Sequence, residues 1–179
     1  MLVSLKKLPR PPYSYVYRHM CLTHVDASNN PTMVDVSGKL VTSRRAHARC
    51  FVELPDTVLQ EFQCDVNRLV SKKGPVISTA IIAGVTAAKK TSDLIPFCHH
   101  VAMDSCKIKI DFDCERKNTL RIDCIAVTEA KTGVEMEAFV GATNAALCVY
   151  DMCKAVSHDI RITDVHLVSK TGGKRDYIR

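Results

Sequence analysis

Two stretches of alternating residues constrain the fold of this chain most. Between residues 106 and 112, apolar and charged side chains alternate: Cys106, Ile108, Ile110 and Phe112 against Lys107, Lys109 and Asp111. A second alternating stretch covers residues 120–127, and the residues between the two stretches are polar. A period of two is typical of a strand with one buried face. The two stretches therefore predict a β-hairpin packed against a core.

Helical segments flank this hairpin. Residues 76–90 are apolar and rich in small side chains, which allow close helix packing, and Pro96 ends the segment. A second helix is predicted over residues 136–157, where apolar residues lie on nearly all sides. A third is predicted from Pro55, because apolar residues recur at helical spacing as far as Leu69 and a Ser-Lys-Lys-Gly stop follows.

Further strands are predicted over residues 46–54 and 160–168, from their alternation and apolar content. The elements then follow the order strand, helices, two strands, helix, strand. This order predicts an α+β fold of the ferredoxin-like type, an antiparallel sheet covered by helices on one face.

The basic charge of the chain is concentrated near its start. The net charge is +6, and the first 25 residues hold Lys6, Lys7, Arg10 and Arg18 and no acidic residue. This composition is found in organellar targeting segments, but no clear amphipathic Arg-rich helix is visible here, which favours a disordered extension or a precursor remnant. We predict a flexible basic tail over residues 1–32, one domain over 33–174 and a loose C-terminus over 175–179.

Nine cysteines are present, an odd number with no C-x-x-C pair. No secretory signal or apolar run of membrane-spanning length accompanies them, so no membrane association is predicted. The cysteines indicate free thiols in a reducing compartment, the mitochondrial matrix or the cytoplasm. Most lie in apolar strings and are predicted to be small buried hydrophobic residues.

A candidate acid/base pair closes the helix predicted over 136–157. Asp151 and Lys154 are three residues apart and therefore share one helix face. Surface pairs of this kind are common and stabilise little. Here the neighbouring residues are apolar, so the helix is predicted to be largely buried, and a charged pair on a buried helix is either costly or lines a site.

Other titratable residues gather in two short windows. Cys98 and His99 are possible zinc ligands, but adjacent histidines rarely chelate one ion and no partner motif is present, so no metal is predicted. The alternative is a core thiol beside a polar loop. Glu135 and Glu137 are either acids favoured at a helix N-terminus or, for one of them, a substrate contact.

Several lysines lie in loops or at element ends. If several of them converge on one pocket, they would bind a polyphosphate. They are Lys39, Lys72, Lys73, Lys89, Lys90, Lys131, Lys170 and Lys174. The Gly-Gly-Lys at 172–174 lacks the spacing of a phosphate-binding P-loop. No stripe of basic and aromatic residues is present, so no nucleic-acid partner is predicted.

Five ordered segments together resemble the cyclic pyranopterin monophosphate synthase family. They are Met-Val-Asp-Val-Ser-Gly-Lys at 33–39, Lys-Thr-Ser-Asp-Leu-Ile-Pro-Phe-Cys-His at 90–99, Thr-Gly-Val-Glu-Met-Glu-Ala at 132–138, Tyr-Asp-Met-Cys-Lys-Ala-Val at 150–156 and Lys-Thr-Gly-Gly-Lys at 170–174. The chain departs from the family pattern at His100, Val101, Thr171 and Ile81, which leaves every proposed catalytic group in place.

The resemblance implies a ferredoxin-like subunit that assembles as a hexamer, a trimer of dimers, with sites at subunit interfaces. It implies an enzyme of molybdenum cofactor biosynthesis whose substrate is a cyclised dihydro-GTP, made from GTP by a radical enzyme that would be its functional partner. The products would be cyclic pyranopterin monophosphate and pyrophosphate. No cofactor is implied.

The resemblance also implies a role for each candidate residue. Asp151 and Lys154 would be the general acid/base pair. Phe97, Cys98, His99, Met136 and Glu137 would contact the substrate, Lys73, Lys89 and Lys170 would hold phosphates or assist, and Glu135 would support the site. Two alternatives stay open: a non-catalytic scaffold that docks the radical enzyme, and a zinc-dependent hydrolase centred on Cys98 and His99.

Overall fold

The computed structural model describes residues 25–26, 28, 30–61 and 69–179, and the chain divides into the units Met1–Thr32 and Met33–Arg179. In the first unit, Val25 forms a single antiparallel bridge with Pro31. The Asp26 carboxylate accepts hydrogen bonds from the backbone N–H groups of Ser28 and Asn30. Most of the predicted basic tail lies outside the described residues.

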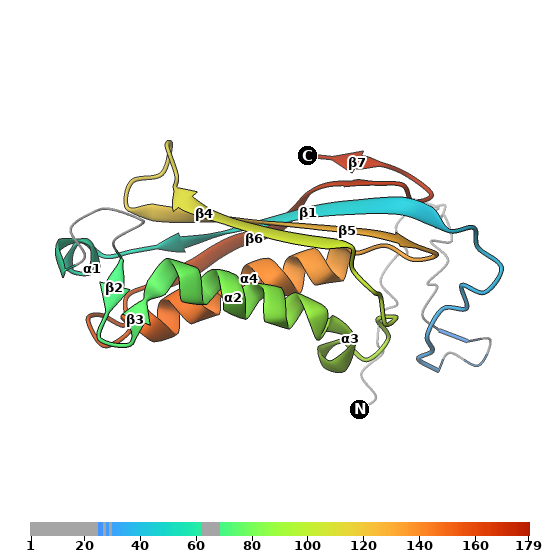
Figure 1. Ribbon diagram of the computed structural model, residues 1–179, viewed down its shortest axis with the longest axis horizontal. Helices are drawn as coiled ribbons and strands as arrows, with labels where there is room; N and C mark the ends of the chain where they lie inside the picture. The colour runs from blue at the N-terminus through green and yellow to red at the C-terminus, as the bar shows by residue number, and fades with distance from the viewer. Residues whose placement is uncertain (1–24, 27, 29, 62–68) are drawn as a thin grey trace, which may run out of the picture. The chain divides into compact units, whose positions relative to one another are not determined.

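The second unit is built on a five-stranded antiparallel sheet (Figure 1). Its strand order is β4 (Ser105–Phe112), β5 (Thr119–Ala130), β1 (Thr42–Glu53), β6 (Arg161–Thr171) and β7 (Tyr177–Ile178). The predicted hairpin is confirmed, since β4 and β5 pair from Ser105 opposite Val127 to Phe112 opposite Leu120. The apolar alternates of this hairpin face the core.

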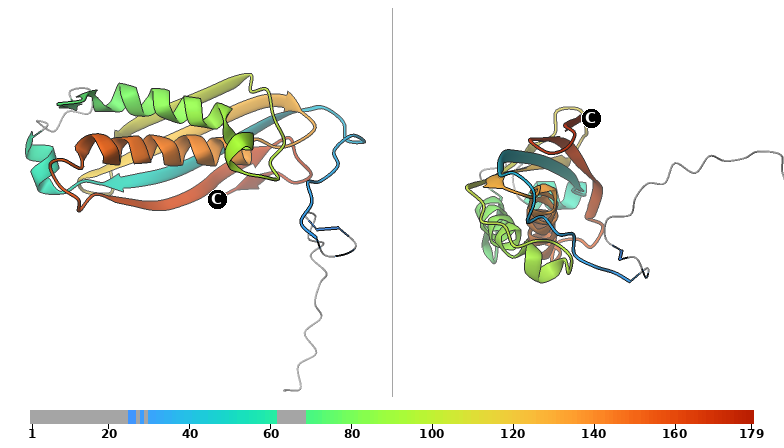
Figure 2. Two further views of the ribbon diagram at one scale, coloured as in Figure 1. Left: turned by 90° about the horizontal axis from the view of Figure 1, so that it is seen from below. Right: turned by 90° about the vertical axis from the view of Figure 1, so that its right-hand side faces the viewer.

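Two long helices cover one face of the sheet. They are α2 (Val76–Lys89) and α4 (Glu135–Cys153), which lie side by side beneath the strands (Figure 2). Both were predicted, and the α+β class is confirmed. The helices approach closely because glycines meet at the crossing: a Cβ on Gly84 would lie only 2.6 Å from the carbonyl oxygen of Gly141.

Shorter elements join these parts. They are α1 (Asp56–Glu61), the two-stranded β2 (Val70–Ser71) and β3 (Gly74–Pro75), and α3 (Thr91–Leu94). The helix predicted from Pro55 is described only as α1, because residues 62–68 lie outside the described part. The segment expected to be loose at the C-terminus includes β7, which pairs with β6, and the Arg179 N–H donates to the Val168 carbonyl.

Candidate active site

Helix α4 determines where the predicted site residues lie, because it carries them at both ends. Glu135, Met136 and Glu137 form its first turn, Asp151 lies in its last turn, and Lys154 is its C-cap. A helix of 19 residues is about 28.5 Å long at 1.5 Å per residue. Within one subunit, the predicted residues therefore form two separate groups and not one site.

The first group joins Lys73, Asp151 and Lys154, and we call it the lysine–aspartate group. The Asp151 carboxylate accepts one hydrogen bond from Lys73 Nζ at 2.7 Å and one from Lys154 Nζ at 2.8 Å. Lys73 comes from the β2–β3 turn, and its ammonium also donates to the Asp151 carbonyl at 3.0 Å. The sequence predicted the pairing of Asp151 with Lys154 and included Lys73 among the candidate phosphate-binding lysines, but did not predict that Lys73 would contact Asp151.

The charges of this group are fixed by their mutual contacts. Hydrogen bonds from Lys154 and Lys73 lower the pKa of Asp151 to about 2. The Asp151 carboxylate in turn raises the pKa of Lys154. All three side chains are about half exposed, so the group presents two ammonium ions at the surface, arranged around one carboxylate. This arrangement suits the binding of an anion and the donation of a proton.

The second group lies at the other end of α4, and we call it the cysteine–glutamate group: Cys98, His99, Glu135, Glu137 and Lys170. Lys170 Nζ donates to Glu135 at 2.9 Å, and Cys98 Sγ donates to Glu137 at 3.8 Å. His99 Nε2 lies 2.7 Å from the Val34 carbonyl. A carbonyl only accepts, so Nε2 carries the proton and leaves Nδ1 as an acceptor when the ring is neutral.

Glu137 is the most unusual carboxyl group in this region. It is 2% exposed, and its Oε2 atom is buried with no hydrogen-bond partner. Burial raises the pKa of Glu137. Burial and the neighbouring Glu137 carboxylate raise the pKa of Cys98 to about 11. The Cys98 thiol is therefore protonated near neutral pH, and burial brings Glu137 closer to the pH range in which a carboxyl group can exchange a proton.

The Cys98 pKa predicts slow alkylation. At pH 8, iodoacetamide should modify Cys98 about a hundredfold more slowly than the exposed Cys114, because only the thiolate reacts and burial suppresses it. Peptide mass spectrometry after timed quenching measures both rates in one sample. A Glu137→Gln variant removes the neighbouring charge and should increase the Cys98 rate while leaving Cys114 unchanged; equal rates for both cysteines in the parent protein would contradict the assignment.

The remaining predicted residues lie near the second group or on its chain segments. Phe97 directly precedes Cys98 and is 40% exposed, and Met136 is 38% exposed on α4. Lys89 is the last residue of α2, one residue before the segment that contains α3. These exposed apolar side chains beside the buried Glu137 and the partly exposed Glu135 give this end of α4 a mixed surface, as a ligand with a ring and charged substituents requires.

The structure adds contacts near His99 for residues that were not among the predicted site residues. Asp35 lies close to His99 and Lys131, and hydrogen bonds from Ser37, together with these two neighbours, lower its pKa. Lys131 Nζ donates to the Ser37 carbonyl at 2.6 Å. Arg44 donates to the carbonyls of Ala130 and Lys131. Asp35 belongs to one of the five matching segments, so its motif was the only available signal.

Within the described residues, no three His, Cys, Asp or Glu side chains gather closely enough to hold a metal ion. Cys98 and His99 contact different partners, Glu137 and the Val34 carbonyl. In the same part of the chain, no helix has the length and apolar content to cross a membrane.

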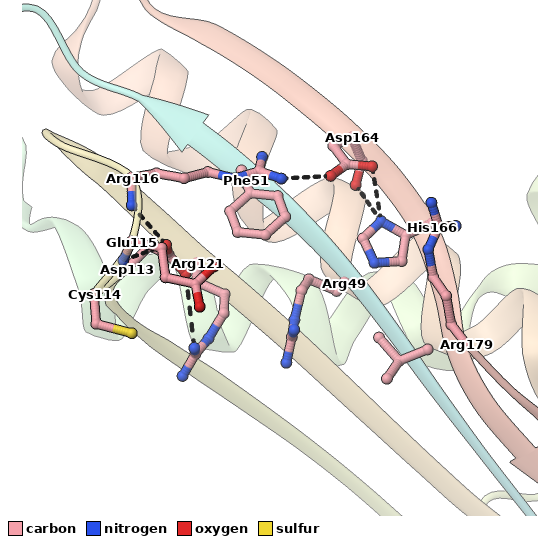
Figure 3. A pocket seen from close by; sticks show the side chains of 11 residues that line it. Arg49, Phe51, Asp113, Cys114, Glu115, Arg116, Arg121, Asp164, His166 and Arg179 are labelled. Atoms are coloured by element: carbon pink, nitrogen blue, oxygen red, sulfur yellow. Dashed lines mark hydrogen bonds and ion pairs between the residues drawn. The ribbon is translucent and has the colours of Figure 1, made fainter.

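A separate cavity of about 460 Å³ opens on the sheet face away from α2 and α4 (Figure 3). Its wall contains Arg49, Arg116, Asp164 and His166, and none of the predicted site residues. Its charges largely pair with one another: Arg116 donates to Asp164 at 2.8 Å and lies over the Phe51 ring. The side chains that line this cavity therefore form a network of paired charges, distinct from both groups on α4.

Asp123 organises the charges beside this cavity and predicts a dependence of stability on pH. It accepts hydrogen bonds at 2.7 Å from both His47 and Arg49 and one at 3.1 Å from Arg121. Burial alone would raise the pKa of Asp123, but the bonds from Arg49 and His47 outweigh it and the pKa is lowered. These contacts therefore stabilise the folded protein above the unfolded pKa of about 3.9. Their contribution to the free energy of unfolding is lost as the pH falls through the lower pKa of the folded state.

We expect Asp123→Asn to lower the free energy of unfolding at pH 7 by about 1–3 kcal/mol, because partly buried cations lose their acceptor. The difference from the parent protein should shrink as the pH falls below the unfolded pKa. Urea titrations across this range measure it. A difference independent of pH would mean that Asp123 is not held as an anion by its partners.

The comparisons with known proteins agree on one family. The MoaC family profile matches residues 33–173. A cyclic pyranopterin monophosphate synthase of Xanthomonas oryzae pv. oryzae is 50% identical over 155 residues, which cover 87% of this chain and 92% of the relative. The molybdenum cofactor biosynthesis bifunctional protein of Synechocystis is 47% identical over 86% of this chain, and the match covers 44% of that protein. Molybdenum cofactor biosynthesis protein 1 of Dictyostelium discoideum is also 47% identical, over 80% of this chain and 25% of its own length.

Proposed function

The chain belongs to the MoaC family, and we propose that it converts cyclised dihydro-GTP to cyclic pyranopterin monophosphate with release of pyrophosphate. It is then an enzyme of molybdenum cofactor biosynthesis, a cyclic pyranopterin monophosphate synthase like its relatives at 50% identity. The observation that carries the proposal is the lysine–aspartate group, where two ammonium ions share one carboxylate.

We propose that this group performs the proton transfers. Opening a purine ring and closing a pterin ring requires a placed acid or base at each step. Asp151 holds the Lys154 ammonium in one orientation, and Lys154 donates the proton. Formation of a cyclic phosphate develops negative charge on the departing pyrophosphate, and the Lys73 ammonium stabilises it. Once a substrate closes the site and excludes water, the pKa of a lysine falls and proton exchange near neutrality becomes possible.

The cysteine–glutamate group would contact the rest of the substrate. The protonated Cys98 thiol offers a donor to ring atoms, the Glu137 carboxyl group offers acceptor oxygens or, when protonated, a donor, and His99 Nδ1 offers an acceptor. Phe97 and Met136 supply apolar surface for the ring system. Lys89 and Lys170 would hold phosphates, and Glu135 orients Lys170 through their 2.9 Å contact.

One subunit cannot bring both groups to a single small substrate, because α4 separates them. We propose that a second copy completes each site, within a hexamer built as a trimer of dimers. The outward side of the helical layer supports this assembly: Met136 and Leu147 on α4 and Ile82 on α2 are 38%, 52% and 67% exposed. Two antiparallel copies of α4 across a two-fold axis would place one subunit's lysine–aspartate group beside the other's cysteine–glutamate group.

Mixing two inactive variants tests this arrangement. Lys154→Ala and Lys170→Ala each damage a different group, so a mixed dimer has one intact site and one doubly damaged site. After dissociation, equal mixing and reassembly, half of the dimers are mixed and about a quarter of the parent activity should return. Native mass spectrometry verifies the exchange. If exchanged assemblies stay inactive, both groups work within one subunit.

The fold and the neighbouring enzyme also enter the proposal. The order β1, α2, β4, β5, α4, β6 and the sheet order β4-β5-β1-β6 support a ferredoxin-like subunit over residues 33–174. The name of the Synechocystis relative, a bifunctional protein, supports a functional link with a second enzyme of the pathway, for which we propose the radical enzyme that makes the substrate.

The deciding experiment supplies purified protein with cyclised dihydro-GTP, freshly made by the radical enzyme, and follows the pterin product and pyrophosphate together. Both should appear in equal amounts. Tight binding of the radical enzyme without product would favour the scaffold function instead. Metal analysis of the same preparation separates the third possibility, since a zinc hydrolase requires about one zinc per chain.

A further inference from the structure

A pair of thiols lies under the helices, away from both groups on α4. The Sγ atoms of Cys106 on β4 and Cys124 on β5 are 3.9 Å apart, and both are free thiols. In the β4–β5 register Cys106 lies opposite Ala126, and Ile108 lies opposite Cys124. The two cysteines are therefore diagonal neighbours on the same, helix-facing side of the sheet.

The two thiols differ in access and in acidity. Cys106 is partly exposed on β4, which is the edge strand of the sheet, whereas Cys124 is fully buried. A hydrogen bond links the two Sγ atoms, and this bond with the positive charge of Lys89 lowers the pKa of Cys106 despite its burial. The same bond and burial raise the pKa of Cys124. A reachable, more acidic thiol beside a resolving thiol is the arrangement that oxidation requires.

We propose that Cys106 and Cys124 are a modification site at which a peroxide forms a reversible disulfide. The Cys106 thiolate attacks one oxygen of the peroxide and becomes a sulfenic acid, and with hydrogen peroxide the other oxygen leaves as water after protonation. The Cys124 thiol then attacks the Cys106 sulfur and displaces a second water. Two thiols and one hydrogen peroxide thus give one disulfide and two waters, with sulfur oxidised and peroxide reduced.

The disulfide would be strained and easily reduced. Diagonal neighbours in an antiparallel pair have Cα atoms about 7–8 Å apart, which is above the usual range for a disulfide. The strands must therefore shift to close the bond, and strained disulfides have more oxidising potentials. This favours a reversible modification over a permanent staple.

The shift would reach α4, because Cys124 supports that helix directly. A Cβ on Gly141 would lie 2.7 Å from Cys124 Sγ, so no side chain separates the thiol from the α4 backbone. The Cys50 thiol beside it donates to the Ala142 carbonyl at 3.4 Å. Movement of Cys124 toward Cys106 therefore disturbs the packing of the helix that carries both groups of the proposed active site.

The test treats the full-length protein with hydrogen peroxide and maps its cysteines by mass spectrometry. We expect a Cys106–Cys124 linked peptide, lighter by two hydrogens, which dithiothreitol converts back to two thiols. In Cys124→Ser, Cys106 should stop at a sulfenic acid that dimedone traps. In Cys106→Ser no disulfide should form at Cys124. Cys114→Ser is the matched control and should still form the linked peptide.

Two results would overturn the inference. One is oxidation of Cys114 or Cys98 while Cys106 and Cys124 remain thiols. The other is direct conversion of Cys106 to a sulfinic acid in the parent protein, which would mean that Cys124 cannot reach it. This mapping needs no turnover, so it can fail independently of the proposed function.

A second measurement, of activity, does rest on the proposed function. Fully oxidised protein should lose at least half of its activity and regain it on reduction. Unchanged activity would mean that the disulfide does not disturb α4.

Discussion

Lys154→Ala should lower turnover of cyclised dihydro-GTP about a thousandfold or more, the range expected when a positioned proton donor is removed. The Lys154 ammonium is held 2.8 Å from Asp151, so alanine removes both a proton donor and half of the positive charge of the lysine–aspartate group. Pterin product and pyrophosphate should fall together. The loss should appear mainly in kcat, because removal of an interaction that forms only in the transition state slows turnover without weakening substrate binding.

Two further variants make this result specific. Asp151→Asn keeps the shape of the side chain but removes the charge that orients Lys154, and we expect a similar loss with assembly intact. Lys109→Ala is the matched control, since Lys109 forms an ion pair of 2.7 Å with Asp111 on the exposed face of β4, opposite to the face that packs on the helices. Lys109→Ala should retain parent activity. Parent-like turnover in Lys154→Ala, measured on correctly assembled protein, would remove the central role of this lysine.

Gly84→Ala should be the most destabilising small substitution in the helical layer. The added Cβ would lie 2.6 Å from the Gly141 carbonyl oxygen and would also contact the Ile108 side chain. Ile108 can rotate away, but a backbone carbonyl in α4 cannot. Alanine favours the helix over glycine by up to about 1 kcal/mol, while overpacking costs about 1–3 kcal/mol or more, so we expect a net loss of about 2 kcal/mol.

Thermal unfolding measures this loss, with an expected decrease in Tm of about 4–8 °C for a protein of this size. Gly38→Ala is the control, because nothing lies within 4 Å of a Cβ built there and its φ is not positive. Gly38→Ala should leave Tm unchanged or slightly higher. An unchanged Tm for Gly84→Ala would mean that α2 and α4 can separate at little cost, and the tight contact would not position α4.

The long elements could be predicted from the sequence because each repeats its signal many times. The β4–β5 hairpin alternates over both strands, and α2 and α4 keep their apolar character for three turns or more. The β2–β3 and β7 pairings are two residues long each and show no period. They depend on backbone partners supplied by the rest of the fold, which no local pattern encodes.

The candidate site likewise contains contacts that follow from a local sequence pattern and contacts that depend on the tertiary fold. The contact between Asp151 and Lys154 follows from helix spacing and was predicted. Lys73 is 78 residues from Asp151 in sequence, and only the β2–β3 turn brings them together. The burial of Glu137 was also unpredictable, since Glu135 and Glu137 are the same residue type in the same turn, and only tertiary contacts distinguish them: Lys170 with Glu135 and Cys98 with Glu137. Whether these residues act as proposed stays a prediction.

Helix α4 also sets the spacing between the two groups. Its 19 residues fix both the separation and the relative direction of the two groups at its ends. Each inserted residue would lengthen the helix by about 1.5 Å and turn one end against the other by about 100°. A single insertion near Thr143 would leave every proposed functional residue present, yet Asp151 and Glu137 would point in incompatible directions. Descendants of this chain can therefore change the identity of most α4 residues more easily than their number.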